Sequence, residues 1–183
     1  MRRHDRIYSV GVSPLKASTF LYREVRLIYS FLHNTSTLNS GSDKFLFITV
    51  CRSLRNSVSI FDTDIFVWIE RGNSKAARLV EKEDERFISV QTYLELLQGA
   101  ENKEQHNYTK QFLRDFGFRT LPLSDNIGHR ATVYIEEYSL SHGLRAGDAL
   151  IAATATENNM MLCSSNAKHF KPIKDLKLKV FRP

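Results

Sequence analysis

Residues 147–155 read Gly-Asp-Ala-Leu-Ile-Ala-Ala-Thr-Ala and form the most informative segment of the chain. The run of small and aliphatic residues predicts a helix over 148–158. Because this helix is apolar on nearly every side, we expect it to be buried at the centre of a domain. Asp148 opens the predicted helix, either with a chemical role or as the cap of its N-terminus.

On both sides of this segment, short apolar strands alternate with amphipathic helices. The strands are expected at 58–61, 86–90, 119–123, 160–163 and 177–181. The other helices are expected at 65–70, after Ser74, and at 91–99, 102–116 and 126–141. In the helix over 91–99, Tyr93, Leu94 and Leu97 are predicted to face inward. This order predicts a three-layer α/β/α domain with a mainly parallel central sheet.

The positive charge of the chain is confined to its first third. The 183 residues carry 26 Lys and Arg and 20 Asp and Glu, a net charge of +6. Residues 1–55 hold nine basic and three acidic residues, which leaves 17 (26 − 9) and 17 (20 − 3) for residues 56–183. We therefore predict a basic extension over 1–56, disordered or read from a mis-assigned start, and a domain over 57–183. The extension has two other interpretations: a targeting segment, or an arm that contacts nucleic acid.

Composition excludes several classes of protein. The chain is 42% hydrophobic and 25% charged, which is typical of a globular domain. Its longest apolar run, Phe45–Cys51, is too short to span a bilayer, so no membrane association is expected. Two distant cysteines, Cys51 and Cys163, do not make a disulfide scaffold, and we predict a reducing, cytoplasmic location.

Polar side chains that suit metal binding stand at the ends of the predicted elements. Asp62 and Asp64 follow the first strand, Glu95 lies in the helix after the second, and Asn166 follows the fourth. With Asp148, they would gather at one edge of a parallel sheet. Converging carboxylates repel one another unless a cation lies between them, and oxygen ligands suit Mg²⁺ or Mn²⁺. Such a site is typical of phosphodiester hydrolysis.

Each of these residues also has an ordinary structural explanation. An aspartate after a strand is often a turn or cap residue, which applies to Asp62 and Asp148. A glutamate on an amphipathic helix usually faces solvent, but Glu95 lies between leucines on both sides. The combination of all these residues at one edge favours a functional site over separate structural roles.

Four segments together resemble the PIN domain, and in particular the VapC-like toxins of toxin–antitoxin pairs. They are 60–65, 88–99, 147–155 and 162–170, and the resemblance covers residues 57–183. It implies a Mg²⁺- or Mn²⁺-dependent endoribonuclease whose RNA substrate is tRNA or rRNA. It implies metal ligands at Asp62, Glu95 and Asp148, with Asn166 as a fourth catalytic position. It also implies a cognate VapB-like antitoxin, a homodimer and a toxin–antitoxin hetero-oligomer.

The sequence departs from the family pattern at three positions. Asn166 offers a neutral amide where the family often has Asp. Asp64 stands where the family typically has Asn, and either adds a carboxylate to the site or supports it from outside. His169 stands where the family commonly has Asp, and we interpret it as structural.

Two other functions stay open at this point. The first is a PIN-like module without activity that only binds RNA or a protein. The second is a haloacid dehalogenase-like phosphatase, because Asp62-Thr63-Asp64 after an apolar strand is similar to the nucleophile motif of those enzymes. Such a phosphatase needs a second acid near Asp148, and Ala152 and its neighbours do not supply one.

Overall fold

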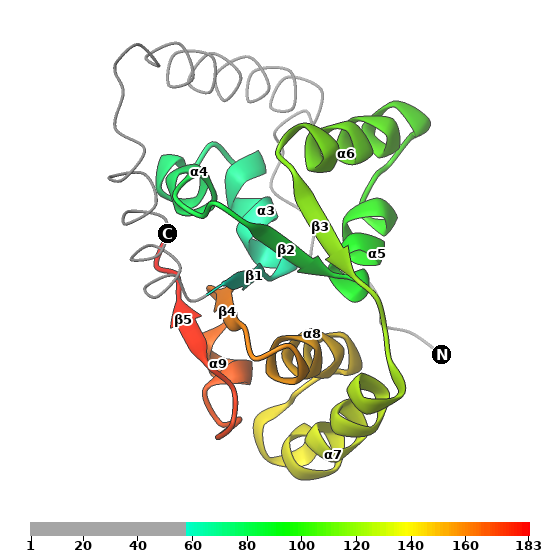
Figure 1. The fold of residues 1–183 in the computed structure, drawn as a ribbon, viewed down its shortest axis with the longest axis vertical. Helices are drawn as coiled ribbons and strands as arrows, with labels where there is room; N and C mark the ends of the chain where they lie inside the picture. The colour runs from blue at the N-terminus through cyan, green and yellow to red at the C-terminus, as the bar shows by residue number, and fades with distance from the viewer. Residues whose placement is uncertain (1–57) are drawn as a thin grey trace, which may run out of the picture.

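A computed structural model describes residues 58–183 (Figure 1), so the predicted extension over 1–56 lies outside the described residues. The strands are β1 (Ser59–Phe61), β2 (Arg86–Ser89), β3 (Phe118–Leu121), β4 (Met161–Ser164) and β5 (Leu178–Val180). The helices are α3 (Thr63–Glu70), α4 (Ser74–Glu81), α5 (Val90–Gln98), α6 (Lys103–Asp115), α7 (Asp125–His142), α8 (Ala146–Glu157) and α9 (Ala167–Phe170). Strands and helices alternate for most of this length, as the sequence predicted.

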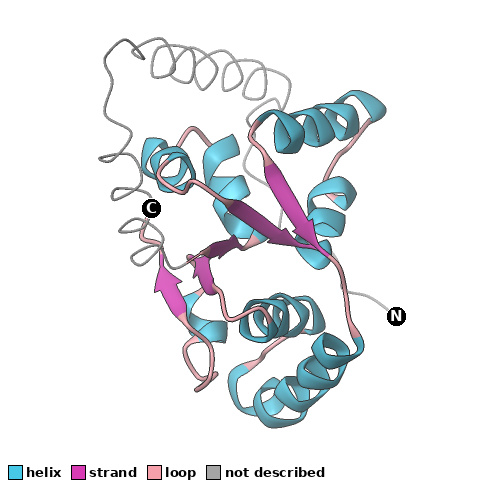
Figure 2. Cartoon of the chain, viewed as in Figure 1, coloured by secondary structure: helices cyan, strands magenta, loops and turns pink. Residues whose placement is uncertain are grey.

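The described strands form one five-stranded sheet in the order β3-β2-β1-β4-β5, and every neighbouring pair is parallel (Figure 2). The central strand β1 pairs with β2 on one side and with β4 on the other. Helices cover both faces of this sheet. The predicted three-layer α/β/α architecture is therefore confirmed.

Alternate residues of each strand enter two separate hydrophobic cores, because side chains of a strand point to opposite faces. Ile60 and Leu162 belong to the core beneath α7 and α8. Phe61 and Cys163 belong to the core beneath α3, α4 and α6. Figure 1 shows these two groups of helices on opposite sides of the sheet. Both faces of the central strands are buried, which explains their unbroken apolar runs.

The apolar helix α8 lies in the interior, as its composition predicted. Ala149, Ala152, Ala153 and Ala155 are fully buried, and small side chains here allow α8 to pack closely on the sheet and on α7. One detail of the prediction is wrong, because α8 begins two residues before Asp148. Asp148 is therefore no N-cap; it lies in the first turn, where its Oδ2 accepts a hydrogen bond from the backbone N–H of Arg145 at 3.3 Å.

Helix boundaries follow local capping. Asn73, and not Ser74, caps α4, because its Oδ1 accepts hydrogen bonds from the N–H groups of Lys75 and Ala76. Gly143 ends α7 in the left-handed conformation (φ 71°) that glycine adopts readily. No helix within residues 58–183 is long and apolar enough to cross a membrane.

Candidate active site at the carboxyl edge of the sheet

The strand order reverses at β1 and β4, and the predicted site residues lie beyond the carboxyl ends of these two strands. From β1 the chain proceeds to β2 and β3 in one direction, whereas β4 leads to β5 in the other. Asp62 follows β1 directly and donates its backbone N–H to the carbonyl of Cys163 in β4 at 3.0 Å. In open parallel sheets such a reversal opens a crevice in which ligands bind.

Asp62 is the most deeply buried of the predicted site residues, with an exposed fraction of 5%. Its Oδ1 accepts a hydrogen bond from the N–H of Thr63 at 2.7 Å and so caps α3. Its Oδ2 accepts one from Ser164 Oγ, also at 2.7 Å. Burial raises the pKa of Asp62 well above its usual value, and the charges of Asp64 and Asp148 raise it further. Asp62 therefore lies close enough to two other carboxylates for their charges to affect its own ionisation.

Glu95 joins this edge from α5. Its Oε2 accepts a hydrogen bond from Thr63 Oγ1 at 2.5 Å, and its Oε1 accepts one from Gln91 Nε2 at 2.9 Å. A Cβ placed on Gly147 would lie only 2.6 Å from Glu95 Oε1. Glycine at the start of α8 thus leaves the space that this carboxylate occupies. The half-buried, bonded position of Glu95 differs from that of an ordinary solvent-facing glutamate.

Asp148 and Asn166 meet at His169. His169 Nδ1 lies 2.9 Å from Asp148 Oδ2 and 3.1 Å from Asn166 Nδ2. The side chains of His169 and Asp148 are both largely buried, with exposed fractions of 20% and 18%. The sequence identified His169 only as a departure from the family pattern. Its spacing of three residues from Asn166, within one helical turn, is the signal that places the two side chains together.

Shared hydrogen-bond partners connect Asp62, Glu95, Asp148 and Asn166, but their side chains do not converge on one point as metal ligands do. Among residues 58–183, no three His, Cys, Asp or Glu side chains are placed to hold one metal ion together. The three carboxylates instead contact different side chains: Ser164 for Asp62, Thr63 and Gln91 for Glu95, and His169 for Asp148. A shared metal site of Asp62, Glu95 and Asp148 therefore stays a prediction.

The chemistry of this edge nevertheless fits a hard divalent cation. The candidate donors are carboxylate and amide oxygens, which Mg²⁺ and Mn²⁺ prefer. Oδ1 of Asp64 is buried and has no hydrogen-bond partner among the described residues. Neither Asp62 nor Asp64 forms an ion pair within residues 58–183. Two neighbouring acids, one buried and one half-buried, with no ion-pair partner within residues 58–183, are the situation that a bound cation relieves.

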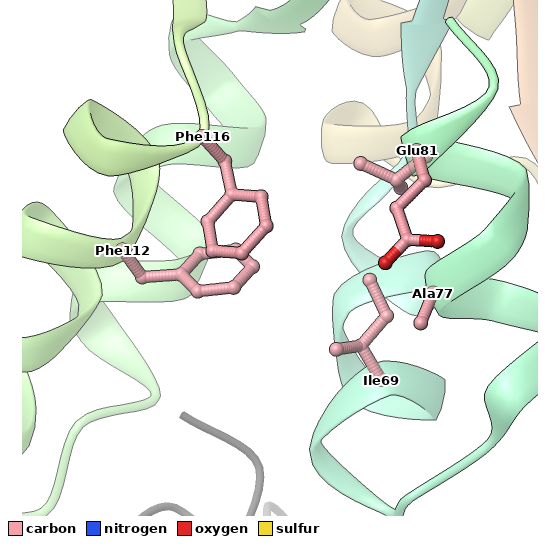
Figure 3. A pocket seen from close by; sticks show the side chains of 6 residues that line it. Ile69, Ala77, Glu81, Phe112 and Phe116 are labelled. Atoms are coloured by element: carbon pink, nitrogen blue, oxygen red, sulfur yellow. The ribbon is translucent and has the colours of Figure 1, made fainter. Parts of the chain in front are cut away.

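A shallow apolar hollow lies between α3, α4 and α6, and the predicted site residues do not line it. Figure 3 shows Phe112 and Phe116 facing Ile69 and Ala77 across the hollow, with the carboxylate of Glu81 directed toward it. Val80 completes the lining. The hollow is thus distinct from the acidic edge, and its apolar walls carry none of the chemistry predicted from the sequence.

We expect Asp62→Asn to raise the melting temperature of the protein in EDTA at pH 7. Asparagine can cap α3 through its own Oδ1, and Ser164 can accept from its amide. Folding raises the pKa of Asp62, so this residue contributes to stability at a pH below the pKa of an unfolded aspartate. That contribution is lost as the pH rises through the pKa of Asp62 in the folded protein, because the buried carboxyl then becomes charged. The stabilisation should therefore be small near pH 4 and grow toward neutral pH, as measured by thermal unfolding.

Asp125→Asn is the control for this prediction, because Asp125 is exposed in the first turn of α7. An aspartate near a helix N-terminus is mildly favourable, so its loss should not stabilise the protein. A melting temperature of Asp62→Asn that lies below that of the parent at pH 7 would contradict the electrostatic explanation.

Comparison with known proteins assigns residues 59–175 to a family. The sequence profile of the PIN domain matches residues 59–175, which is more than half of the chain. The chain therefore belongs to the PIN domain family. Within that family it is similar to Ribonuclease VapC10 of Mycobacterium tuberculosis, with 30% identity over 122 residues, 64% of this chain and 90% of the relative.

Solved structures agree with this assignment. A toxin–antitoxin complex from Klebsiella pneumoniae contains a chain with 28% identity and a TM-score of 0.56, covering 64% of this chain and 94% of that one. VapBC2 from Rickettsia felis, bound to a DNA fragment from its promoter, has 24% identity and a TM-score of 0.57 over 68% and 98% of the two chains. The second likeness concerns the fold alone. The resemblance inferred from the sequence is thus confirmed.

Proposed function

We propose that this chain is a metal-dependent endoribonuclease toxin, which a cognate antitoxin holds inactive. The observation that carries the proposal is the pair of carboxylates of Asp62 and Asp64 that share the hydroxyl of Ser164 beyond the central strands of a PIN fold, within reach of the charge of Asp148. The homology to a VapC ribonuclease supports RNA as the substrate class. Structured RNA, either tRNA or rRNA, is the substrate that the family resemblance favours.

The metal would be held by Asp62, Glu95 and Asp148, with Asn166 assisting. When bound, Mg²⁺ or Mn²⁺ would neutralise charge on the scissile phosphate and activate water for attack. Ser164 fixes the carboxylate of Asp62, and buried surroundings limit the other orientations available to it. Thr63 and Gln91 fix the carboxylate of Glu95 from two sides. The protein thus contributes oriented acids at the edge of a rigid sheet.

His169 has a positioning role in this proposal. Its Nδ1 lies within hydrogen-bond distance of Asp148 and also of Asn166. One imidazole therefore connects the two candidate residues that come from α8 and from the turn after β4. Residues that orient metal ligands commonly contribute to metal affinity and activity.

The partner in this proposal is a VapB-like antitoxin. Several of the solved structures with this fold are VapBC or other toxin–antitoxin complexes, including those from Klebsiella pneumoniae and Rickettsia felis. We propose the same kind of assembly here, located in the cytoplasm where cellular RNA is available. A homodimer of the toxin is part of the same proposal.

The test is cleavage of end-labelled tRNA and rRNA fragments by the purified full-length chain in Mg²⁺. We expect endonucleolytic cuts at a small number of sites, and no hydrolysis of p-nitrophenyl phosphate. Release of p-nitrophenol without RNA cleavage would instead support the phosphatase. Tight RNA binding without any cut, in Mg²⁺ and in Mn²⁺, would support the inactive binding module.

A further inference from the structure

Hydrogen bonds hold the carboxylate of Asp64 in one orientation, whereas the sequence left open whether it adds a carboxylate to the site or supports the site from outside. It lies in the first turn of α3, two residues after Asp62. Its Oδ2 accepts hydrogen bonds from Ser164 Oγ at 3.1 Å, from the backbone N–H of Ser165 at 2.8 Å and from Ser165 Oγ at 2.6 Å. Oδ2 therefore receives its hydrogen bonds from the last residue of β4 and from the residue that follows it.

Trp68 fixes this arrangement from the next turn of α3. Its indole N–H donates to Ser165 Oγ at 3.1 Å, so the proton of that hydroxyl is directed to Asp64. The order Trp68 to Ser165 to Asp64 sets the orientation of the carboxylate. Oδ1 is consequently held in one place instead of rotating to share the donors of Oδ2.

The hydroxyl of Ser164 cannot satisfy both neighbouring acids at once. Ser164 Oγ lies 2.7 Å from Asp62 Oδ2 and 3.1 Å from Asp64 Oδ2, and it has a single proton to donate. Its oxygen meanwhile accepts the backbone N–H of Asn166 at 2.9 Å. The two carboxylates thus share one donor, and the edge has more acceptors and negative charge than donors to match them.

The other carboxylate oxygen of Asp64, Oδ1, receives no hydrogen bond within residues 58–183. It is buried and has no hydrogen-bond partner among the described residues, which is costly for a carboxylate oxygen. An asparagine at this position would place an N–H₂ group there and remove one negative charge. A carboxylate at this position is explained if Oδ1 faces a cation.

We propose that Asp64 supplies Oδ1 as an additional carboxylate ligand to the divalent cation of this edge, beyond Asp62, Glu95 and Asp148. The inference rests on the proposed metal-dependent function. It assigns Asp64 a share in cation affinity through its charge, whereas Ser165 and Trp68 only hold it in position. Hard cations gain affinity as the number of charged ligands rises, so the effect is measurable by direct titration.

The test is Asp64→Asn in the full-length chain, with Mn²⁺ binding measured by calorimetry. Asparagine keeps an oxygen that can accept from Ser165, so the turn is retained while the charge is lost. We expect Mn²⁺ binding to weaken by roughly tenfold or more. The melting temperature in EDTA should stay unchanged or rise, because one half-buried charge next to Asp62 is removed.

Ser165→Ala is the matched control, because it removes a hydrogen bond from the turn and leaves the charge of Asp64 in place. We expect it to weaken Mn²⁺ binding much less than Asp64→Asn. Trp68 is the single tryptophan of the chain, and its indole N–H donates to Ser165, so its fluorescence emission in EDTA reports on the turn. Ser165→Ala removes this hydrogen bond and should change the emission, whereas Asp64→Asn keeps it. Unchanged emission in Asp64→Asn would confirm that the turn is intact.

Two results would overturn the inference. If Asp64→Asn binds Mn²⁺ within about twofold of the parent while Asp148→Asn does not bind it, Asp64 is no ligand and the proposed function stands. If neither the parent nor any variant binds Mn²⁺, the metal-dependent function fails and the inference fails with it. A loss in Ser165→Ala equal to that in Asp64→Asn would also contradict a role through charge.

Discussion

Replacing Asp148 with asparagine is expected to abolish RNA cleavage and leave the fold intact. Asparagine has the same shape, and its amide oxygen can accept the backbone N–H of Arg145 as Asp148 does. It cannot supply the negative charge at the N-terminal turn of α8. Loss of a charged metal ligand removes several kcal/mol of transition-state stabilisation, so the rate should fall by roughly 1000-fold. End-labelled RNA and thermal unfolding measure the two properties separately.

Asp125→Asn is again the matched control, because it makes the same chemical change in the first turn of α7, away from the acidic edge. It should cleave RNA at the rate of the parent. Parent-level cleavage by Asp148→Asn would refute the assignment of this residue to the site. A collapse of its melting temperature would show that the contact of Asp148 with His169 is mainly structural.

Gly147→Ala should impair activity strongly at little cost in stability. The added Cβ would lie 2.6 Å from Glu95 Oε1 and 3.3 Å from Gln91 Nε2, so the carboxylate must move. Moving the end of a flexible side chain is cheap, and alanine is a better helix former than glycine. A catalytic group displaced by about 1 Å can cost roughly 100-fold in rate. We therefore expect a large loss of cleavage with a melting temperature close to that of the parent.

Gly128→Ala tests whether a methyl group on a helical glycine is harmless elsewhere. Gly128 lies in α7, and a Cβ there would meet no atom within 4 Å. This variant should retain full activity and be at least as stable as the parent. Full activity in Gly147→Ala as well would mean that the position of Glu95 is not needed for cleavage.

Much of the fold could be predicted because its signals are local. The apolar segment 147–155 requires burial on all sides, and a helix that is buried in this way needs a sheet and a second helix around it. Short strands that alternate with helices along the chain indicate an α/β domain with a parallel sheet. Asp62 could be assigned to the edge because it follows an apolar strand directly, and the structure places it there at the N-cap of α3.

Other features depend on packing that a sequence pattern does not record. Leu94 was predicted to face inward but is 52% exposed, whereas the polar Thr92 of the same helix is fully buried. Thr92 tolerates burial because its Oγ1 lies 3.0 Å from the hydroxyl of Ser89, which caps α5. Hydrophobic periodicity cannot detect a polar residue whose hydrogen bonds are satisfied internally. Of the three residues predicted to face inward, Tyr93 does pack against the core and Leu97 is half-buried, so the error is confined to Leu94.

The contact of His169 with the predicted site residues was not predicted for a similar reason. Its contact with Asp148 joins two segments that are 21 residues apart in sequence. Only the packing of α9 against α8 brings these segments together. The short helix α9 was itself not predicted, because four residues carry too little periodicity to be recognised.

The most direct measurement is RNA cleavage by the full-length chain before and after removal of divalent cations. The protein is dialysed against EDTA, assayed on end-labelled RNA, and assayed again after Mg²⁺ is restored in excess. We expect cleavage by the parent to disappear in EDTA and to return with Mg²⁺, whereas Asp148→Asn should stay inactive in both conditions. Cleavage that continues unchanged in EDTA would show that the acids at this edge do not act through a divalent cation.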